Sequence, residues 1–256
     1  MKRSVIGLMM VTSFIIACKK DSISGIGCYI SKYYYTYPSG ATDTTEVTYI
    51  SDDSLSYTTR SAGNKYIYCY KIKGDSLILK EYLNTLSILN FYGGSKLNSQ
   101  GFSIGDAFFH GNGSVNSTGT STYNSEGRPV TSNSDYVTYQ NFYTNYYDAN
   151  GNKTYSILQR AGIVTNRDSF VYQYDMSHQS KLEYGYPNAK YYGIPDKNLV
   201  LQIRRYDTNT DTLNSYSNYT YVLDPDGYVA QKNTTTTYAG SGGVYTYIEK
   251  FSIQCH

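Results

Sequence analysis

The sequence KYIYCYKIK, residues Lys65–Lys73, decides the fold class. Its side chains alternate strictly between two faces. One face would carry Tyr66, Tyr68, Tyr70 and Ile72, and the other Ile67, Cys69, Lys71 and Lys73. Alternation with period two is typical of a β-strand that buries one face. The same alternation recurs in Phe170–Tyr174, Asn218–Leu223 and Tyr245–Ile253. The pattern therefore predicts an all-β protein.

Three turn signals separate such strands. Each has a large residue, then Asn or Asp, any residue, an acid or amide, and glycine, as in Tyr123–Gly127, Tyr147–Gly151 and Leu223–Gly227. An Asp such as Asp224 starts a type I turn by bonding to nearby backbone, and glycine supplies the left-handed residue that rejoins the strand. The predicted turn-forming residues are Asp224, Gly227, Gly127 and Gly151. We expect a many-stranded antiparallel meander of hairpins, curled into an open or closed barrel-like sheet.

Other stretches are less regular. No long amphipathic helix is evident after residue 20, and Leu77–Leu89 fits either a short helix or two strands. Gly93–Gly119 is rich in Gly, Ser and Asn and is predicted to be loop-like. Met176–Asn198 contains two prolines and is predicted to be a long crossover or capping loop. Strands resume beyond it with the same composition, so residues 28–256 are predicted to form one domain.

The N-terminus carries a targeting signal. Lys2 and Arg3 precede an apolar run, Val5–Ala17, that is too short to span a bilayer, and a cysteine, Cys18, follows at once. Residues 1–17 are therefore predicted to be a signal peptide, with 18–27 as a short tether. The junction resembles the bacterial lipobox, which implies a lipidated Cys18. The alternative is an ordinary secretory signal with an incidental cysteine.

The resemblance to a lipoprotein implies an address. Such a cysteine carries several acyl chains, and two or more chains give stable anchoring. The membrane, reached through this lipid anchor, is thus an expected partner, with the protein held at the outer membrane. Residues Lys19–Asp21 resemble the Bacteroidota signal for export to the cell surface, which favours the cell surface over the periplasmic face.

The charge balance excludes one class of partner. The chain has 22 basic and 20 acidic residues, and removing residues 1–17 takes away two basic ones. A mature chain of balanced charge lacks the basic surplus that phosphate binding needs, so no nucleic-acid partner is expected. The composition is instead dominated by 33 tyrosines, with 8 phenylalanines and no tryptophan. Tyr and Thr suit pleated, half-buried strands.

Cysteine and histidine patterns give no metal or cofactor site. Beyond Cys18, the cysteines Cys28, Cys69 and Cys255 leave one disulfide or none equally open, and their pairing is undetermined. No Cys-x-x-Cys or His-x-x-x-His occurs. Asp175, Ser177 and His178 lie close in sequence, but the chain has no Gly-x-Ser-x-Gly nucleophile elbow. We therefore predict no catalytic residue, metal or cofactor.

A family resemblance covers roughly the C-terminal half. Tyr191–Leu199, followed by the hairpin Asn218–Val229, resembles uncharacterised Bacteroidota lipoproteins with a curled antiparallel β-sheet. The turn units also resemble, in degraded form, the tyrosine-aspartate repeats of Rhs-type wall proteins. The matching motifs are structural. The resemblance therefore implies a fold and an envelope address, and it implies no active site.

Tyrosine supplies the one functional hint. A tyrosine ring packs while its hydroxyl stays wet, and rings often stack on sugars. The face Tyr66, Tyr68 and Tyr70 is thus the tentative binding face; the alternative is that these rings pair across strands within a broad sheet. A transmembrane barrel also has alternating strands, but abundant Thr and Asn and no clear apolar outward band disfavour it.

The predicted function is a lipid-anchored cell-envelope protein that is not an enzyme. It would be a binding or structural module, with a glycan or another envelope protein as partner. The alternative is an envelope hydrolase acting on polysaccharide or peptidoglycan. Such an enzyme would need two acids facing each other across a cleft, roughly 5–10 Å apart.

Overall fold

The computed structural model describes residues 29–51, 54–61, 63–162, 166–181 and 191–254. Cys18, Cys28 and Cys255 lie outside these residues, as do the expected signal peptide and tether, so the predictions made for them stay predictions. Among the described residues, no helix has both the length and the apolar character needed to cross a bilayer.

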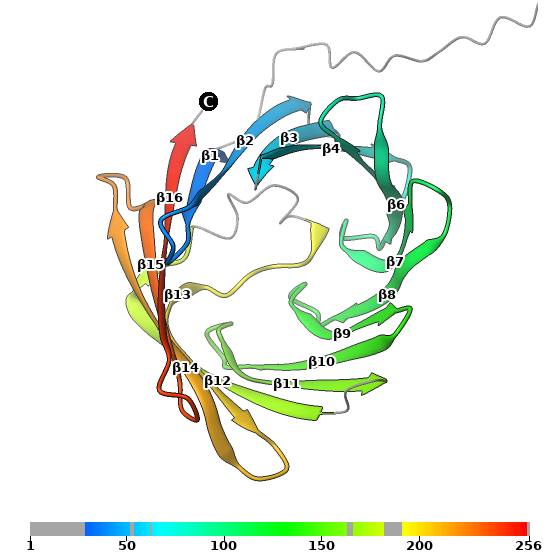
Figure 1. Ribbon diagram of the computed structural model, residues 1–256. Helices are drawn as coiled ribbons and strands as arrows, with labels where there is room; N and C mark the ends of the chain where they lie inside the picture. Colours follow the sequence, from blue (N-terminus) through cyan, green and yellow to red (C-terminus); the bar gives the residue numbers. More distant parts are fainter. Residues whose placement is uncertain (1–28, 52–53, 62, 163–165, 182–190, 255–256) are drawn as a thin grey trace, which may run out of the picture.

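The described residues form sixteen β-strands in one sheet, and each strand pairs antiparallel with its neighbours in sequence. β1 also pairs with β16, which closes the sheet into a barrel (Figure 1). The prediction of an all-β antiparallel meander is confirmed, and the barrel is closed. The strands are β1 Tyr29–Thr36, β2 Thr42–Ser51, β3 Ser54–Ser61, β4 Asn64–Lys73, β5 Ser76–Leu83, β6 Leu89–Leu97, β7 Ser103–His110, β8 Val115–Tyr123, β9 Pro129–Tyr136, β10 Tyr139–Tyr147, β11 Lys153–Gly162, β12 Asn166–Gln179, β13 Asn198–Asp207, β14 Thr212–Leu223, β15 Val229–Tyr238 and β16 Val244–Gln254.

Alternation along each strand separates an inner from an outer face. On β5, Leu77 and Leu79 are buried, whereas Ile78 and Lys80 are exposed. On β8 and β14 the exposed positions are mostly Thr and Asn: Thr118, Thr120, Thr122, Asn218 and Thr220. Transmembrane barrels show the opposite arrangement, with an apolar outer band and a polar lumen. Here the buried leucines of β5 lie inside, and the outer wall is mostly polar with scattered apolar residues such as Val171 and Val222.

Two apolar clusters form the core. The first joins Leu55, Tyr70, Leu77, Leu79, Leu97 and Tyr191, and the second joins Ile30, Leu199, Val229 and Phe251. The second cluster contains residues of both terminal strands, β1 and β16, together with residues from β13 and β15. Apolar burial therefore adds to hydrogen bonding where the barrel closes.

The prediction of a loop over Gly93–Gly119 is wrong, because this stretch contains the end of β6, all of β7 and the start of β8. Its glycines serve close packing as well as turns. A Cβ on Gly93 would collide with the ring of Phe108 on β7, and one on Gly119 would collide with the carboxylate of Asp106. The Leu77–Leu89 stretch, left open as helix or strands, forms most of β5 and begins β6.

The meander gives the barrel two distinct ends. We call one the capped end, because residues 191–197, the cap segment that leads into β13, lie across the interior there (Figure 1). The β4–β5, β6–β7, β8–β9, β10–β11 and β14–β15 turns lie at this end. We call the other end the rim; it carries the β1–β2, β5–β6, β7–β8, β9–β10, β13–β14 and β15–β16 turns. Met176–Gln179, predicted as part of the loop, instead extends β12.

Four turns at the capped end, all except the β4–β5 turn, share one hydrogen-bond pattern. The Asp224 Oδ1 accepts hydrogen bonds from the backbone N–H of Asp226 at 3.0 Å and of Tyr228 at 2.8 Å, and Gly227 has φ +78°. The same two bonds occur at Asn124, Asp148 and Asn98. The turn at Asn98 follows the same sequence pattern, yet it lies inside the stretch predicted to be a loop.

Two of these turns offer a matched test of glycine. Gly101 and Gly127 both have φ +83°, but a Cβ on Gly101 meets nothing within 4 Å, whereas one on Gly127 would lie 2.5 Å from the ring of Phe102. We expect Gly101→Ala to cost about 1 kcal/mol from backbone strain. Gly127→Ala should cost about 2 kcal/mol, because steric overlap is added. Urea unfolding measures both, and equal losses would contradict the packing described at Gly127.

Candidate binding cavity inside the barrel

The predicted binding face lies on the inside of β4. Tyr70 is buried in the first apolar cluster, and Tyr68 stacks on Tyr57 with their ring centroids 4.4 Å apart. Tyr57 also lies 5.8 Å from Tyr70, centroid to centroid. Burial raises the pKa of both Tyr57 and Tyr68 above the ordinary value for tyrosine. Neighbouring rings thus already occupy much of this face, and its role in glycan binding stays a prediction.

A cavity of about 350 Å³ lies on the opposite side, between β10 and β14. Its volume is within the range of small-ligand pockets. Four aromatic rings and two cationic side chains line it: Tyr143, Phe170, Tyr172, Tyr219, Lys153 and Arg205. Asn145, Ser156, Ile203, Ser215 and Ser217 complete the lining, which contains no acidic residue. The cavity therefore combines ring faces with hydrogen-bonding groups.

One wall of the cavity is built by β11 and β12. Ser156 and Tyr172 stand on neighbouring strands, and their hydroxyl oxygens are 2.8 Å apart. The Lys153 ammonium lies 5.5 Å from the centroid of the Tyr172 ring, close enough for a cation–π interaction. Burial raises the pKa of Tyr172, so this phenol is neutral at physiological pH and can both donate and accept hydrogen bonds.

A buried carboxylate holds the arginine of the cavity in place. Asp168 is only 1 % exposed, and its Oδ2 lies 2.7 Å from Arg205 Nη2 and 3.7 Å from Arg160 Nη1. Asn214 Nδ2 donates a hydrogen bond of 3.3 Å to Asp168 Oδ1. The Arg205 Nε is buried and has no hydrogen-bond partner among the described residues. The Nε–H group of Arg205 is therefore a hydrogen-bond donor that no described residue uses.

The other walls come from β10 and β14. Tyr143 and Tyr219 line the cavity from these two strands, and Ser217 Oγ lies 2.8 Å from the Thr236 hydroxyl on β15. Burial raises the pKa of Tyr219 to about 12. The Lys232 ammonium is 5.6 Å from the centroid of the Tyr219 ring. The Tyr219 ring thus has a cationic neighbour on the adjacent strand β15.

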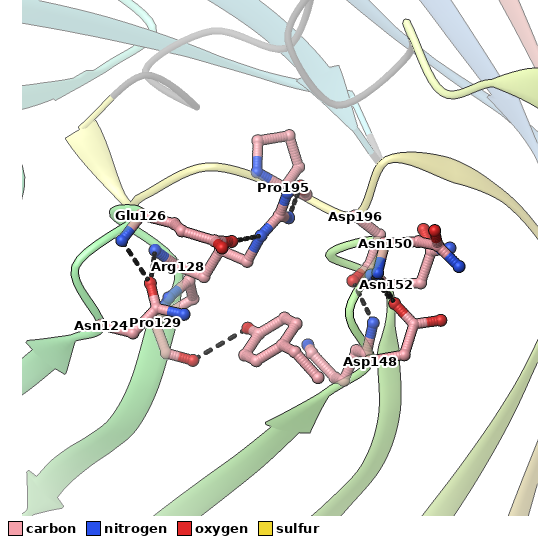
Figure 2. A network of polar contacts seen from close by, with 11 residues as sticks. Asn124, Glu126, Arg128, Pro129, Asp148, Asn150, Asn152, Pro195 and Asp196 are labelled. Carbon is pink, nitrogen blue, oxygen red and sulfur yellow. Dashed lines mark hydrogen bonds and ion pairs between the residues drawn. The ribbon is translucent and has the colours of Figure 1, made fainter.

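The chain at the capped end is tied to the hairpin turns beside the cavity (Figure 2). Arg128 Nη1 donates a 2.6 Å hydrogen bond to the carbonyl of Pro195, and the Lys153 N–H donates a 2.8 Å bond to Asp196 Oδ1. Asn152, which is fully buried, exchanges two hydrogen bonds of 3.0 and 2.9 Å with Asn198. The part of the predicted capping loop that is described is therefore anchored by side chains of the β8–β9 and β10–β11 turns.

The serine, histidine and aspartate noted in the sequence do come together, but not as a catalytic triad. Asp175 Oδ2 lies 2.7 Å from His178 Nδ1, and Ser177 Oγ lies 3.0 Å from the same nitrogen. A triad requires the carboxylate and the nucleophile on opposite ring nitrogens. Hydrogen bonds from Ser177 and then His178 lower the pKa of Asp175 to about 2. Within the described ranges, no three His, Cys, Asp or Glu side chains gather as a metal site would need.

Sequence reasoning missed the cavity. Its rings come from three strands, and only Phe170, Tyr172 and Tyr219 lie in stretches whose alternation was noted. Alternation predicted which residues of a single strand share a face. It did not predict which strands face one another across the barrel.

No protein-family model matches this chain, and no curated protein matches its sequence. A porin-like protein from Bacteroides uniformis is similar in structure, with a TM-score of 0.59, 14 % identity and coverage of 88 % of this chain and 96 % of the other. A porin-like protein from Bacteroides vulgatus has a TM-score of 0.57 and 11 % identity, covering 88 % of this chain and 98 % of the other. These likenesses show a shared barrel fold.

Proposed function

We propose that this protein is a lipid-anchored, non-enzymatic module of the bacterial envelope that binds a glycan inside its barrel. The observation that carries the proposal is the cavity between β10 and β14, in which Tyr143, Tyr172 and Tyr219 surround a space of about 350 Å³. Sugars present apolar C–H faces that stack on rings, and hydroxyls that bond to side chains such as Ser156 and Asn145. The cavity offers both kinds of group.

The envelope address rests on separate support. The junction at Ala17 and Cys18 resembles a lipobox, and the similar barrels in two Bacteroides species agree with the resemblance to Bacteroidota lipoproteins. The polar outer wall suits a barrel whose side is in water and whose attachment to the membrane is a lipid. A lipid-facing wall would instead need an apolar band.

The hydrolase alternative has less support. A glycoside hydrolase needs two carboxylates facing each other across its substrate. The residues that line the cavity include no Asp or Glu. Asp168, a buried acid that contacts the cavity residue Arg205, is already engaged by Arg205 and Asn214. This arrangement suits binding better than hydrolysis.

A glycan array tests the proposal. The probe is soluble protein that begins at Lys19, which keeps every described strand. We expect a saturable hit whose dissociation constant rises roughly fivefold in Tyr143→Ala and likewise in Tyr219→Ala, since a stacked ring contributes about 1 kcal/mol. Tyr146→Ala is the matched control, because Tyr146 lies on the same strand as Tyr143 but is 49 % exposed on the outer wall.

Three outcomes speak against the cavity. An array with no hit would contradict glycan binding itself. A hit that survives both cavity substitutions but is lost in Tyr66→Ala would move the site to the face on β4. Loss in the Tyr146→Ala control would place the glycan on the outer wall.

A further inference from the structure

The exposed apolar side chains of this barrel are concentrated at the rim. Most of the exposed large hydrophobic residues among those described belong to rim turns or to the strand ends beside them. Five rim turns contribute, with Tyr37, Leu86, Val115, Val137 and Val244 as representatives. Because these turns lie around the barrel mouth, they form a ring and not a single spot.

Such residues are unusual at turn tips. Turns are normally made of Gly, Asn, Asp, Ser and Pro. A single exposed apolar residue needs no explanation, but several at one end of a barrel do. Here Val137 is 80 % exposed in a two-residue turn, Leu86 is 59 % exposed in the β5–β6 turn, and Val244, the first residue of β16, is 61 % exposed. An exposed ring of this kind marks a contact surface.

Charge separates the two ends of the barrel. The rim turns at 37–41, 84–88, 111–114, 137–138 and 239–243 contain no charged residue. The β13–β14 turn adds one, Asp211. The turns and cap segment at the opposite end contain Asp75, Glu126, Arg128, Asp148, Asp196, Lys197, Asp224 and Asp226. Charged residues near the rim, such as Asp43, Asp135 and Asp207, lie in the strands behind the turns, so the turn tips themselves offer an almost uncharged surface to a bilayer.

Tyrosines stand just behind the tips. Tyr136 and Tyr139 flank the Val137–Thr138 turn with their rings stacked 4.6 Å apart, and Tyr238 and Tyr245 flank the last rim turn 5.7 Å apart. Tyrosine is enriched where a protein crosses from hydrocarbon to water, because the ring is apolar and the hydroxyl is polar. Aliphatic tips backed by tyrosines match that boundary.

We propose that the rim is a membrane-contact surface, on which the barrel stands with its turn tips at the headgroup–acyl boundary and its charged capped end in water. The tether permits this. The eleven residues 18–28 reach at most roughly 36–40 Å, while the eight residues of β1 rise roughly 26 Å from the capped end to the rim. An anchor at Cys18 can therefore lie in the same membrane as the rim. The contact does not depend on glycan binding.

Vesicle flotation tests the proposal, with soluble protein that begins at Lys19 and so lacks the acyl anchor. We expect the protein to float with phosphatidylcholine vesicles and to stay bound in 1 M salt, since salt screens charge and not apolar burial. The triple variant Leu86→Asn, Val137→Asn, Val244→Asn should weaken partitioning by about ten- to hundredfold.

The matched control replaces three apolar residues that are exposed away from the rim: Val171→Asn, Leu201→Asn and Val222→Asn. This variant should bind vesicles as the parent does, and circular dichroism checks that both variants are folded. Failure of the parent to float, or equal loss in both variants, would overturn the proposal. A third result would also overturn it: the parent does not bind vesicles, and analytical sedimentation shows a dimer that the rim substitutions convert to a monomer. The rim would then be an interface between two copies of this chain.

Discussion

Leu77→Ala is expected to lower the free energy of unfolding by about 3 kcal/mol, the largest loss among the substitutions considered for this barrel. Leu77 is only 2 % exposed and lies in the first apolar cluster with Leu55, Tyr70 and Leu97. Removing three carbons there forfeits transfer free energy and leaves a cavity that the stiff sheet cannot close. Urea unfolding, monitored by circular dichroism, measures the loss.

The neighbouring residue provides the control. Ile78 follows Leu77 on β5 but points to the outer wall, where it is 36 % exposed. We expect Ile78→Ala to cost less than about 1 kcal/mol, because exposed apolar atoms contribute little to burial. A larger loss for Ile78→Ala than for Leu77→Ala would contradict the assignment of inner and outer faces.

Asp168→Asn is expected to lower the free energy of unfolding by nearly as much, about 2 to 3 kcal/mol. The substitution keeps the shape of the side chain but removes the charge that Arg205 and Arg160 face. Removing one partner of a buried ion pair typically costs 3–5 kcal/mol because the other charge remains in place. Both arginine side chains are about one-third exposed here, so water reduces the loss.

Asp226→Asn is the matched substitution at an exposed acid. Asp226 lies in the β14–β15 turn, where its backbone and not its carboxylate makes the described hydrogen bonds. It should change the unfolding free energy by less than about 0.5 kcal/mol. Chemical denaturation measures both losses of unfolding free energy. Equal losses would show that the ion pair between Asp168 and Arg205 does not stabilise the fold.

Much of the fold could be predicted because it is local. Alternation in Lys65–Lys73 reports burial of one face, and the pattern around Asp224 reports a turn that its own side chain builds. Composition misled at Gly93 and Gly119, because glycine is also required where inner side chains of adjacent strands come close. The turn at Asn98 carried the same signal as the others and could have been found.

The cavity could not be predicted in the same way. On β4 alternation shows that Tyr68 and Tyr70 share one face and that Cys69 and Lys71 share the other, but it does not show which inner side chains of other strands lie near Tyr70. Closure of the sheet decides this, and it depends on pairing between β1 and β16, such as Tyr33 with Phe251. Tyr143, Tyr172 and Tyr219 come together only once that closure has set the curvature of the wall.

The seam between β1 and β16 imposes an order of assembly on the chain. Every other strand pair joins neighbours in sequence, so each hairpin can form as soon as its second strand is available. The seam joins residues as distant as Ser31 and Ser252. Until Val244–Gln254 has emerged, β1 and β15 each present an open edge able to recruit foreign strands. The last eleven-residue strand thus removes two aggregation-prone edges at once, by pairing with β15 on one side and β1 on the other.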